Sequence, residues 1–343
     1  MCKILISIII PVYNAEKTIQ RTLASLIHNN ERIEIICVND GSTDDSENVI
    51  YSMMKHDKRI RYVKQNNQGA SAARNNGICH ANGEFIMFCD ADDEYDNNAL
   101  LFIKEDIISK EPDFIVFERR TVFQNNRSFD RLKNNNELIS IKTNWVEYLN
   151  NIFFQREHST VVCNKVYKAS IIMKEKVCFD KGLVLGEDLL FNIAYLKNVK
   201  LIVEDGRAIY VQHKVDNSLT SIKRPDYFEQ DTIVIKRVKD LYYDYVESLI
   251  PFLDRHILNT TIIACDRALN GRDATSIREK RKIIKRVIED AECKLAYDRS
   301  INRVDIAMKR KLNLLFHKHI FVYHMLFILL PRIKGGILNF FRV

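Results

Sequence analysis

The chain has 343 residues, of which 46% are hydrophobic and 28% charged, with only 10 glycines and 5 prolines. This length suffices for two domains that each bury a core, and the composition excludes a collagen-like or low-complexity protein. Lys and Arg exceed Asp and Glu by 7, and residues 271–343 alone contain 17 basic and 7 acidic residues. Such a basic segment is typical of contact with nucleic acid or with an anionic membrane surface.

The eight cysteines indicate a reducing environment. None of them forms a Cys-x-x-Cys pair, and several lie in apolar runs that resemble strands. Buried reduced thiols of a cytosolic protein explain this pattern better than disulfides do. A zinc site is not expected for the same reason.

Two apolar stretches do not have the features of targeting or membrane-spanning segments. Ile4–Ile10 runs into Pro-Val-Tyr-Asn and an amphipathic helix, without a small-x-small cleavage site. His319–Pro331 has 13 residues, whereas a helix that crosses a bilayer needs about 20. The sequence therefore predicts neither a signal peptide nor a spanning helix.

From residue 4 onward, apolar strand-like runs alternate with helical patterns. The runs are continuously apolar, as expected for strands that are covered on both faces. We expect Asn14 to cap the first helix and Ser42-x-x-Asp45 to form a capping box at the second. The predicted strands are Ile4–Ile10, Ile33–Val38, Ile60–Val63 and Ile86–Cys89, and a helix rich in small residues spans Gly69–His80.

This alternation predicts an α/β fold with a doubly wound, mostly parallel sheet, followed by a helical C-terminal region. Residues 1–100 and 101–224 would form the two halves of the α/β domain, and 225–343 the helical region. A hairpin around Asp205-Gly206 is expected in the second half. Its strands would be Leu201–Val203 and Ala208–Gln212, and the later helices Tyr227–Tyr245, Leu249–Leu269 and Ile277–Leu295.

The stretch FCDADDEYD, residues 88–96, places five carboxylates in seven positions at the end of an apolar strand. A solvated loop is one interpretation, but ligands of a doubly wound sheet bind at the carboxyl ends of its strands. An EF-hand would need other residues at Tyr95 and Leu101, and a haloacid-dehalogenase-type phosphatase would need Thr in place of Glu94. A D-x-D pair that holds magnesium or manganese on a nucleotide diphosphate is the remaining interpretation.

Four motifs in series decide between these interpretations. They are SIIIPVYNAEKTIQRTLASL (7–26), IICVNDGSTDDS (35–46), NNQGASAARNNGI (66–78) and FCDADDEY (88–95). Their order and spacing resemble a family 2 glycosyltransferase with the GT-A fold, of the type that builds bacterial surface polysaccharides. The resemblance is strong over residues 5–100 and weaker through GEDLLF (186–191) and YVQHKVDNSLTS (210–221).

The resemblance implies a nucleotide site in residues 1–100. Pro11, Tyr13 and Glu16 match the loop that cradles the nucleobase and ribose, and Asp40 matches the acid that accepts a hydrogen bond from N3–H of uracil. Arg74 matches a basic position near the nucleotide. From the residues alone, the alternatives are a turn residue before Gly41 for Asp40, half-buried packing for Tyr13 and a solvated helix residue for Arg74.

The resemblance also implies the metal and its ligands. Asp90 would lie near ribose or sugar hydroxyls, and Asp92 would bind a divalent manganese or magnesium ion. A cation there stabilises the charge that grows on the leaving diphosphate. His213 matches a position that often completes the metal shell or closes over the diphosphate, although a lone His is more often an ordinary hydrogen-bonding residue.

Inverting transfer needs a carboxylate that removes the proton of the acceptor hydroxyl. Family members carry it in an acidic pair ahead of an apolar helix, which here is Glu187-Asp188. The family pattern favours Asp188, and an adjacent carboxylate suits a base because like charges raise each other's pKa. The alternative is that the pair only caps a helix, whose N-terminus stabilises acids.

The resemblance therefore implies a metal-dependent enzyme that moves a sugar from a UDP-sugar to a glycan or lipid-linked glycan acceptor, for lipopolysaccharide or capsule. A sugar nucleotidyltransferase would need a glycine-rich loop that PVYNAEKT lacks, and an inactive scaffold would not need D-x-D and E-D. No aromatic or zinc-finger pattern accompanies the basic segment, so nucleic acid is not expected as a partner. We expect the C-terminus, with cations flanking His319–Leu330, to bind an anionic membrane surface on the cytoplasmic side.

Overall fold

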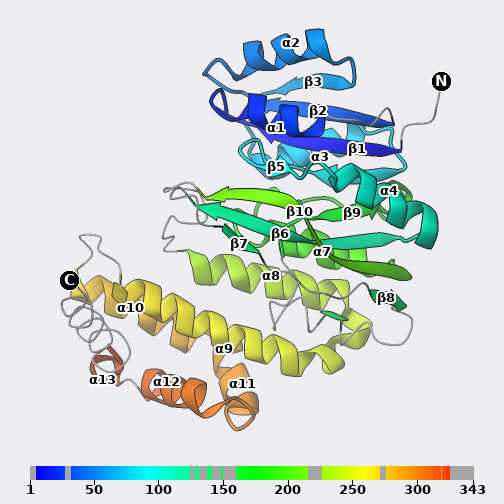
Figure 1. Ribbon diagram of the computed structural model, residues 1–343. Helices are drawn as coiled ribbons and strands as arrows, with labels where there is room; N and C mark the ends of the chain where they lie inside the picture. Colours follow the sequence, from blue (N-terminus) through cyan, green and yellow to red (C-terminus); the bar gives the residue numbers. More distant parts are fainter. Residues whose placement is uncertain are drawn as a thin grey trace, which may run out of the picture. The chain divides into compact units, whose positions relative to one another are not determined.

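A computed structural model shows two compact units, residues 1–152 with 156–218 and residues 153–155 with 219–343 (Figure 1). We describe each unit by itself. The structure describes residues 5–27, 32–123, 128–130, 137–140, 148–149, 160–214, 226–270, 276–317 and 319–324.

The first half of the sheet confirms the predicted alternation. Its four strands run parallel in the order β3-β2-β1-β4, and β1, β2 and β4 are almost completely buried. Covered on both faces, such strands need the continuous apolar runs that the sequence shows. The strands are β1 Ile6–Val12, β2 Ile33–Asp40, β3 Ile60–Gln65 and β4 Phe85–Phe88, and the helices between them are α1 Ile19–Leu26, α2 Ser46–His56 and α3 Ala70–His80.

Helix α3 lies close to strand β1 because its facing residues are small. A Cβ atom on Gly77 would come within 2.3 Å of Cγ2 of Ile9, so that only glycine fits. The helix begins after Gly69, whose φ of 87° is one that other residues rarely adopt. The close approach brings Arg74, in the middle of α3, beneath the carboxyl ends of the strands.

The second half of the sheet mixes strand directions. Strand β9 (Lys165–Lys168) lies antiparallel between β4 and β6 (Phe114–Phe123), and β10 (Leu201–Lys214) runs parallel to β6. Strand β5 (Glu94–Tyr95) pairs antiparallel with β10. The remaining elements are β7 Ser128–Asp130, β8 Glu137–Ser140, α4 Ala99–Lys110, α6 Ala169–Glu175 and α7 Glu187–Leu196. The predicted doubly wound, mostly parallel sheet is therefore confirmed.

The predicted hairpin around Asp205-Gly206 is wrong. Residues 201–214 form the single strand β10, which pairs with β6 along its length and has irregular register between Asp205 and Tyr210. The Asp205 carboxylate accepts hydrogen bonds from the backbone N–H and the guanidinium of Arg207. These bonds close a local bulge, so the turn-forming dipeptide bends the strand without reversing it.

The two predicted helix caps are also wrong. Asn14 has a φ of 49° and its side chain accepts from the backbone N–H of Thr43, while α1 begins only at Ile19. The Ser42 hydroxyl accepts from the N–H of Asn14, and Asp45 makes no side-chain cap on α2. Both polar residues tie the loop after β1 to the loop after β2, an alternative use of the same short side chains.

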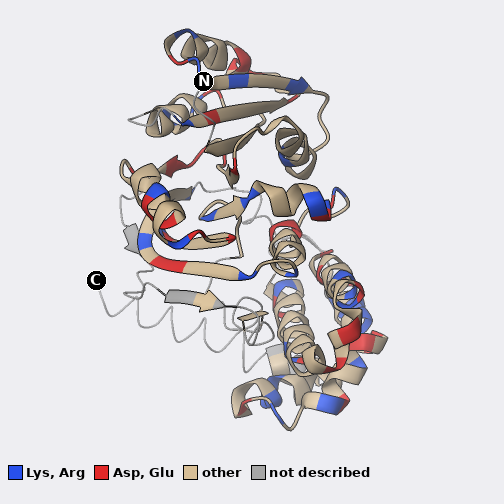
Figure 2. Cartoon of the chain, turned by 90° about the vertical axis from the view of Figure 1, so that its right-hand side faces the viewer, with Lys and Arg blue, Asp and Glu red and all other residues tan. Residues whose placement is uncertain are grey.

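The described residues of the second unit form helices joined by loops. Its elements are α8 Tyr227–Leu241, a 3-10 turn η2 Tyr243–Tyr245, α9 Val246–Asn270, α10 Ile277–Glu289, α11 Ala291–Ser300, α12 Ile306–Phe316 and α13 Ile320–His324. The predicted helix Ile277–Leu295 is two helices, because Asp290 ends α10 and its side chain caps α11 at the N–H of Cys293. Figure 2 shows basic and acidic residues side by side on these helices.

Two predictions about the chain as a whole can be compared with the described residues. Seven cysteines are placed and all of them are free thiols, five of them buried. Among the helices described, none is sufficiently long and apolar to reach across a bilayer. The predicted C-terminal membrane segment falls mostly on residues 325–343, which lie outside the described residues.

Candidate active site

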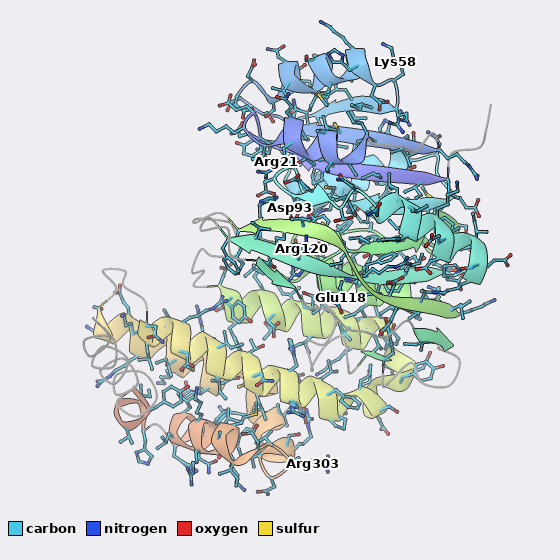
Figure 3. All side chains as sticks on the ribbon, viewed as in Figure 1. Arg21, Lys58, Asp93, Glu118, Arg120 and Arg303 are labelled. Atoms are coloured by element: carbon cyan, nitrogen blue, oxygen red, sulfur yellow. The ribbon has the colours of Figure 1, made fainter. Side chains whose placement is uncertain are left out.

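The acidic stretch lies at the carboxyl end of β4, and α1 and β10 hold it in place. Thr22 and Arg21 of α1 donate hydrogen bonds to the carbonyl oxygens of Ala91 and Asp92, at 3.0 and 2.6 Å. On the other side, the Tyr210 hydroxyl accepts from the N–H of Asp90 at 3.2 Å. Figure 3 shows Arg21 and Asp93 at the same end of this unit. The loop that carries D-x-D is therefore fixed by its backbone.

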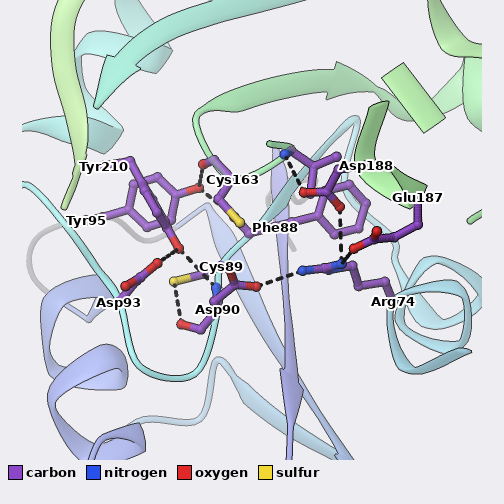
Figure 4. Close-up of polar contacts among 11 residues, drawn as sticks. Arg74, Phe88, Cys89, Asp90, Asp93, Tyr95, Cys163, Glu187, Asp188 and Tyr210 are labelled. Atoms are coloured by element: carbon purple, nitrogen blue, oxygen red, sulfur yellow. Dashed lines mark hydrogen bonds and ion pairs between the residues drawn. The ribbon is translucent and has the colours of Figure 1, made fainter. Parts of the chain in front are cut away.

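Arg74 connects this loop to the predicted base. Its guanidinium lies 2.8 Å from Asp90 Oδ1, 3.2 Å from Asp188 Oδ1 and 3.8 Å from Glu187 Oε1 (Figure 4). Only 7% of the Arg74 side chain is exposed, so these contacts are weakly screened by water. The alternative that Arg74 is a solvated helix residue is therefore excluded. The D-x-D loop and the Glu187-Asp188 pair share the positive charge of its guanidinium.

The electrostatics follow from burial and from the crowding of like charges. Burial, together with the charge of Asp188, raises the pKa of Glu187 to about 7. Burial also raises the pKa of Asp188, although Arg74 opposes that shift. For Arg74 itself, burial lowers the pKa but the charges of Asp188 and Asp90 outweigh it, so the net shift is upward. Arg74 thus stays charged while the two acids hold protons more tightly than usual.

Asp188 is not a helix cap. Helix α7 begins at Glu187 after Gly186, and no side chain caps it. Asp188 Oδ2 instead accepts from the backbone N–H of Val162 at 3.3 Å, in a segment 26 residues earlier. Its side chain is 18% exposed. A carboxylate that is held on one oxygen by an amide, and that still reaches the surface, can take a proton from a bound hydroxyl.

Asp93 is a buried acid of the candidate site that the sequence did not distinguish from its neighbours. It is 2% exposed, and its carboxylate accepts from the Tyr210 hydroxyl at 2.6 Å and from the backbone N–H of His213 at 2.8 Å. Burial and the charge of Asp90 raise the pKa of Asp93 to about 8. The signal available was the doubled acid Asp92-Asp93, of which only the first belongs to D-x-D.

The predicted metal ligand His213 contacts a neighbouring acid. His213 Nε2 contacts Glu94 Oε1 at 2.6 Å, and Glu94 also pairs with Arg21 at 3.0 Å. Among the described residues no three His, Cys, Asp or Glu side chains are grouped as a metal site. Burial and the nearby charge of Asp90 raise the pKa of Asp92, so Asp92 is a carboxylate that a cation would stabilise.

Asp40 lies at the end of β2 and is 3% exposed. Its Oδ1 accepts from the Gln65 side chain and the Gln68 N–H, and its Oδ2 accepts from the Gly69 N–H, each at 2.8 Å. A carboxylate has about four acceptor positions, so Oδ2 keeps one for a ligand donor. Asp40 thus shapes the loop before α3, a role that the sequence did not reveal.

The other predicted nucleotide residues come from the loop after β1. Pro11 lies in β1 opposite Val38, and Tyr13, which follows the strand, is 52% exposed. The Glu16 carboxylate accepts from the N–H of Asp45, while the Glu16 N–H donates to Asp44. Glu16 therefore helps to link the loop after β1 to the loop after β2. The aromatic ring of Tyr13 is exposed in the first of these loops.

Several known proteins are similar to this chain. Residues 7–175 match the sequence model of a family described as Glycosyl transferase family 2. An uncharacterized glycosyltransferase of Haemophilus influenzae is 35% identical over 255 residues, which cover 70% of this chain and 93% of that protein. The poly(ribitol-phosphate) beta-glucosyltransferase of Bacillus spizizenii is 29% identical over 73% of this chain and 40% of its own length.

The uncharacterized glycosyltransferase EpsJ of Bacillus subtilis is 29% identical over 64% of this chain. This chain spans 63% of EpsJ, so the two proteins are not matched over their full lengths. Among solved structures, S. aureus TarS 1-349 in complex with UDP-GlcNAc has a TM-score of 0.71 at 20% identity, covering 93% of this chain and 89% of that chain. At this identity the likeness to TarS concerns the fold.

Proposed function

This chain belongs to glycosyl transferase family 2, and we propose that it is an inverting enzyme that moves a sugar from a UDP-sugar to a glycan acceptor in the synthesis of a bacterial surface polysaccharide. One observation carries the proposal. Arg74 contacts both Asp90 of the D-x-D loop and Asp188 of the acidic pair, at 2.8 and 3.2 Å. A base for the acceptor and an acidic loop for the donor diphosphate therefore belong to one site.

In the proposed reaction, Asp188 accepts the proton of the acceptor hydroxyl as its oxygen attacks the anomeric carbon of the donor. One carbon–oxygen bond forms, the bond from that carbon to the diphosphate breaks, and UDP leaves with the electron pair. Attack from the face opposite the diphosphate inverts the configuration. The raised pKa of Asp188 suits this role, because a base works best when its pKa lies near the working pH.

We propose Asp92 and Asp90 as the residues that would hold a divalent cation. Both offer the oxygen ligands that magnesium and manganese prefer. Burial and then repulsion from Asp90 raise the pKa of Asp92, and a cation would offset both. Such ions are commonly bound through one or two carboxylates plus substrate phosphates. When bound, the cation would supply positive charge to the leaving diphosphate. His213, the other predicted ligand, contacts Glu94 in this structure, and we propose that it completes the metal shell or closes over the diphosphate.

For the nucleotide, we propose that Tyr13 stacks on the base and that the free acceptor position of Asp40 Oδ2 takes N3–H of uracil. Tyr13, in the loop after β1, is exposed. Asp40, at the end of β2, accepts a hydrogen bond from Gly69 in the loop before α3. TarS was crystallised with UDP and with UDP-GlcNAc, which supports a uridine donor here. The acceptor would be a glycan or a lipid-linked glycan on the cytoplasmic face of the membrane.

A donor screen tests the proposal. Purified protein is incubated with manganese and UDP-Glc, UDP-Gal, UDP-GlcNAc or UDP-GalNAc, and released UDP is measured. We expect release from at least one donor and its loss on chelation of the metal. Release from none, with turnover of a sugar carried by another nucleotide, would overturn the role of Asp40. Release from no nucleotide sugar would favour an inactive scaffold, and formation of a nucleotide sugar from a sugar phosphate would favour a nucleotidyltransferase.

The first predicted variant is Asp92→Ala. It removes a metal ligand together with its charge, so we expect most of the activity to be lost at every manganese concentration. Asp96→Ala is the matched control, because Asp96 lies in the same acidic stretch but outside D-x-D. A near-normal kcat in Asp92→Ala would remove this residue from the proposed metal site.

The second predicted variant is Asp188→Asn. It preserves size but cannot accept the hydroxyl proton, so transfer should fall by roughly 100-fold or more while UDP binding persists. Calorimetric titration with UDP and steady-state rates separate the two quantities. Unchanged turnover would show that Asp188 serves packing alone.

A further inference from the structure

Lys165, the first residue of β9, is a buried lysine close to the candidate base. It is 1% exposed, and lysine is almost never buried to this degree without a partner. Its ammonium donates to the carbonyl oxygen of Val161 at 2.6 Å and to Asn164 Oδ1 at 2.9 Å. Both of these contacts hold the ammonium against the segment that immediately precedes β9.

Val161 belongs to a segment, residues 160–164, whose backbone groups are bound one after another. The Asn192 side chain binds the carbonyl of Thr160, and the Tyr95 hydroxyl that of Cys163. The Asn164 carbonyl accepts from the N–H of Phe117, and the Asn164 side chain donates to the carbonyl of the same residue. Lys165 adds the contact with the carbonyl oxygen of Val161.

That contact adjoins Asp188. The peptide that offers its carbonyl oxygen to Lys165 is the one between Val161 and Val162, and its N–H donates to Asp188 Oδ2 at 3.3 Å. One peptide group therefore lies between the ammonium and the carboxylate. Polarisation of the carbonyl by the ammonium strengthens the N–H as a donor, because hydrogen bonds in a chain reinforce one another.

The charges around Lys165 come from three elements. Asp188 of α7 and Glu118 of β6 favour the ammonium, as does Cys163 of the same segment, whereas Arg119 of β6 opposes it. Burial is the largest influence and lowers the pKa of Lys165 to about 7. The charge of Lys165 is therefore present on the acidic side of neutrality, where Asp188 must lose its proton to act as a base.

We propose that Lys165 is a positioning residue for Asp188, holding the Val161–Val162 peptide against the carboxylate and favouring its ionised form. The inference rests on the role proposed for Asp188 and adds a residue that controls it. Lys165 itself does not touch the substrate in this account. It acts through one peptide group and through its charge.

The test uses the Val162 amide as a reporter in the full-length protein. Valine is labelled with ¹⁵N, the Val162 resonance is assigned by its loss in Val162→Ile, and its shift is followed from about pH 4 to pH 9, where carboxylates of raised pKa titrate. We expect a transition from Asp188, and in Lys165→Met its midpoint should move up by about half a pH unit or more. Lys165→Gln, which keeps an N–H donor without charge, should move it in the same direction.

Lys168→Met is the matched control. Lys168 lies on the same strand but its ammonium pairs with Asp113 at 3.1 Å, so its substitution should leave the midpoint unchanged. A Val162 amide that does not titrate in the wild type, or an equal midpoint in wild type and Lys165 variants, would overturn the proposal. These readouts need no donor, so they stand apart from failure of the proposed function.

Kinetics give a second readout on an active donor. In Lys165→Met, kcat should fall by about tenfold on the acidic side of neutrality, with the KM for the donor unchanged and the acidic limb of the kcat–pH profile displaced upward. A uniform loss of kcat at every pH, with no displacement, would show that Lys165 only supports the fold.

Discussion

Arg74 balances three carboxylates with a single guanidinium. Its contacts with Asp90, Glu187 and Asp188 are all within 3.8 Å. Removing Arg74 should be strongly destabilising, by about 3–5 kcal/mol, because the carboxylates would be left without their positive partner. The site therefore stores electrostatic repulsion, since one positive charge cannot neutralise three negative charges, and the proton held by Glu187 relieves part of it.

This balance makes stability depend on pH through Glu187. The pKa of Glu187 is raised to about 7, from an ordinary value of 4.5 in the unfolded chain. Between these values the folded protein binds more protons than the unfolded one, so stability falls as the pH rises through that window. Glu187→Gln removes the ionisation, and we expect the variant to be more stable than wild type at pH 8 by about 1–2 kcal/mol.

Urea unfolding at pH 5 and pH 8 measures this effect. The gain should be smaller at pH 5, where Glu187 of the folded protein is protonated. Glu175→Gln, on α6, serves as the control and should show no such pH dependence. An equal or greater stability of the wild type at pH 8 would contradict the repulsion described here.

Strand β10 is the element that organises the acidic loop. Tyr210 binds both Asp93 and the N–H of Asp90, and the backbone of His213 binds Asp93 a second time. The strand also pairs with β5, which directly follows the loop. Residues 90–95 are thus bound to an element more than a hundred residues later in the chain.

Tyr210→Phe tests this arrangement by removing one oxygen atom. It removes the hydroxyl to which the Asp90 amide donates and one of the two hydrogen bonds that Asp93 accepts, which should cost about 1–3 kcal/mol. The apparent affinity for manganese should fall several-fold, while activity at saturating metal is largely kept. Tyr195→Phe loses an equally buried hydroxyl, bonded to Asp113 and Lys168, and should lose stability without any change in metal requirement. If both variants depend on manganese to the same degree, β10 does not influence metal binding by the acidic loop.

The alternation of strands and helices was predictable because its cause is local. Continuous apolar runs and intervening helical periods specified β1 to β4 with only small errors at their ends. The hairpin at Asp205-Gly206 was mispredicted because the pairing of ten residues of β10 with β6 outweighs a two-residue turn preference. The caps at Asn14 and Ser42 failed because those side chains bind a neighbouring loop, which no local pattern reveals.

The sequence predicted which residues belong to the candidate site, but not which of them contact one another. The family resemblance named Asp90, Arg74 and Asp188, and the structure places them in contact. Arg74 reaches Asp188 across 114 residues of sequence, a separation at which spacing carries no information. The same holds for Asp93 with Tyr210, separated by 117 residues, and the roles of all these residues stay predictions.

At the scale of the whole molecule, the helical unit has an ionic core of its own. Asp254 of α9 is 1% exposed, and it accepts from the Arg299 guanidinium at 2.6 and 3.0 Å and from Ser300 at 3.0 Å. Every acceptor oxygen is engaged, as a buried carboxylate requires. This network joins α9 to α11, so the second unit has internal order that does not depend on the acidic loop of the first.

The predicted membrane contact concerns the end of the chain, most of which lies outside the described residues. After Asp305 the sequence has no acidic residue, and seven Lys or Arg flank two apolar stretches. Each cation near an anionic leaflet contributes about 1 kcal/mol. We expect the protein to float with liposomes that contain anionic lipid and not with neutral ones, and truncation at Pro331 to reduce flotation. Flotation that is equal with and without residues 331–343 would contradict the prediction.

The position of β9 in the sheet has a consequence for how the chain folds as it is synthesised. Strands β1 to β4 and their helices are complete by residue 88, but the strand that pairs with the far side of β4 in the described part of the chain is β9, which begins at Lys165. At about 5–20 residues per second, the apolar edge formed by Phe85–Phe88 stays open for several seconds. An open strand edge of this kind invites pairing with other chains, so nascent chains that stop between these two strands are the form of this protein that most needs a chaperone.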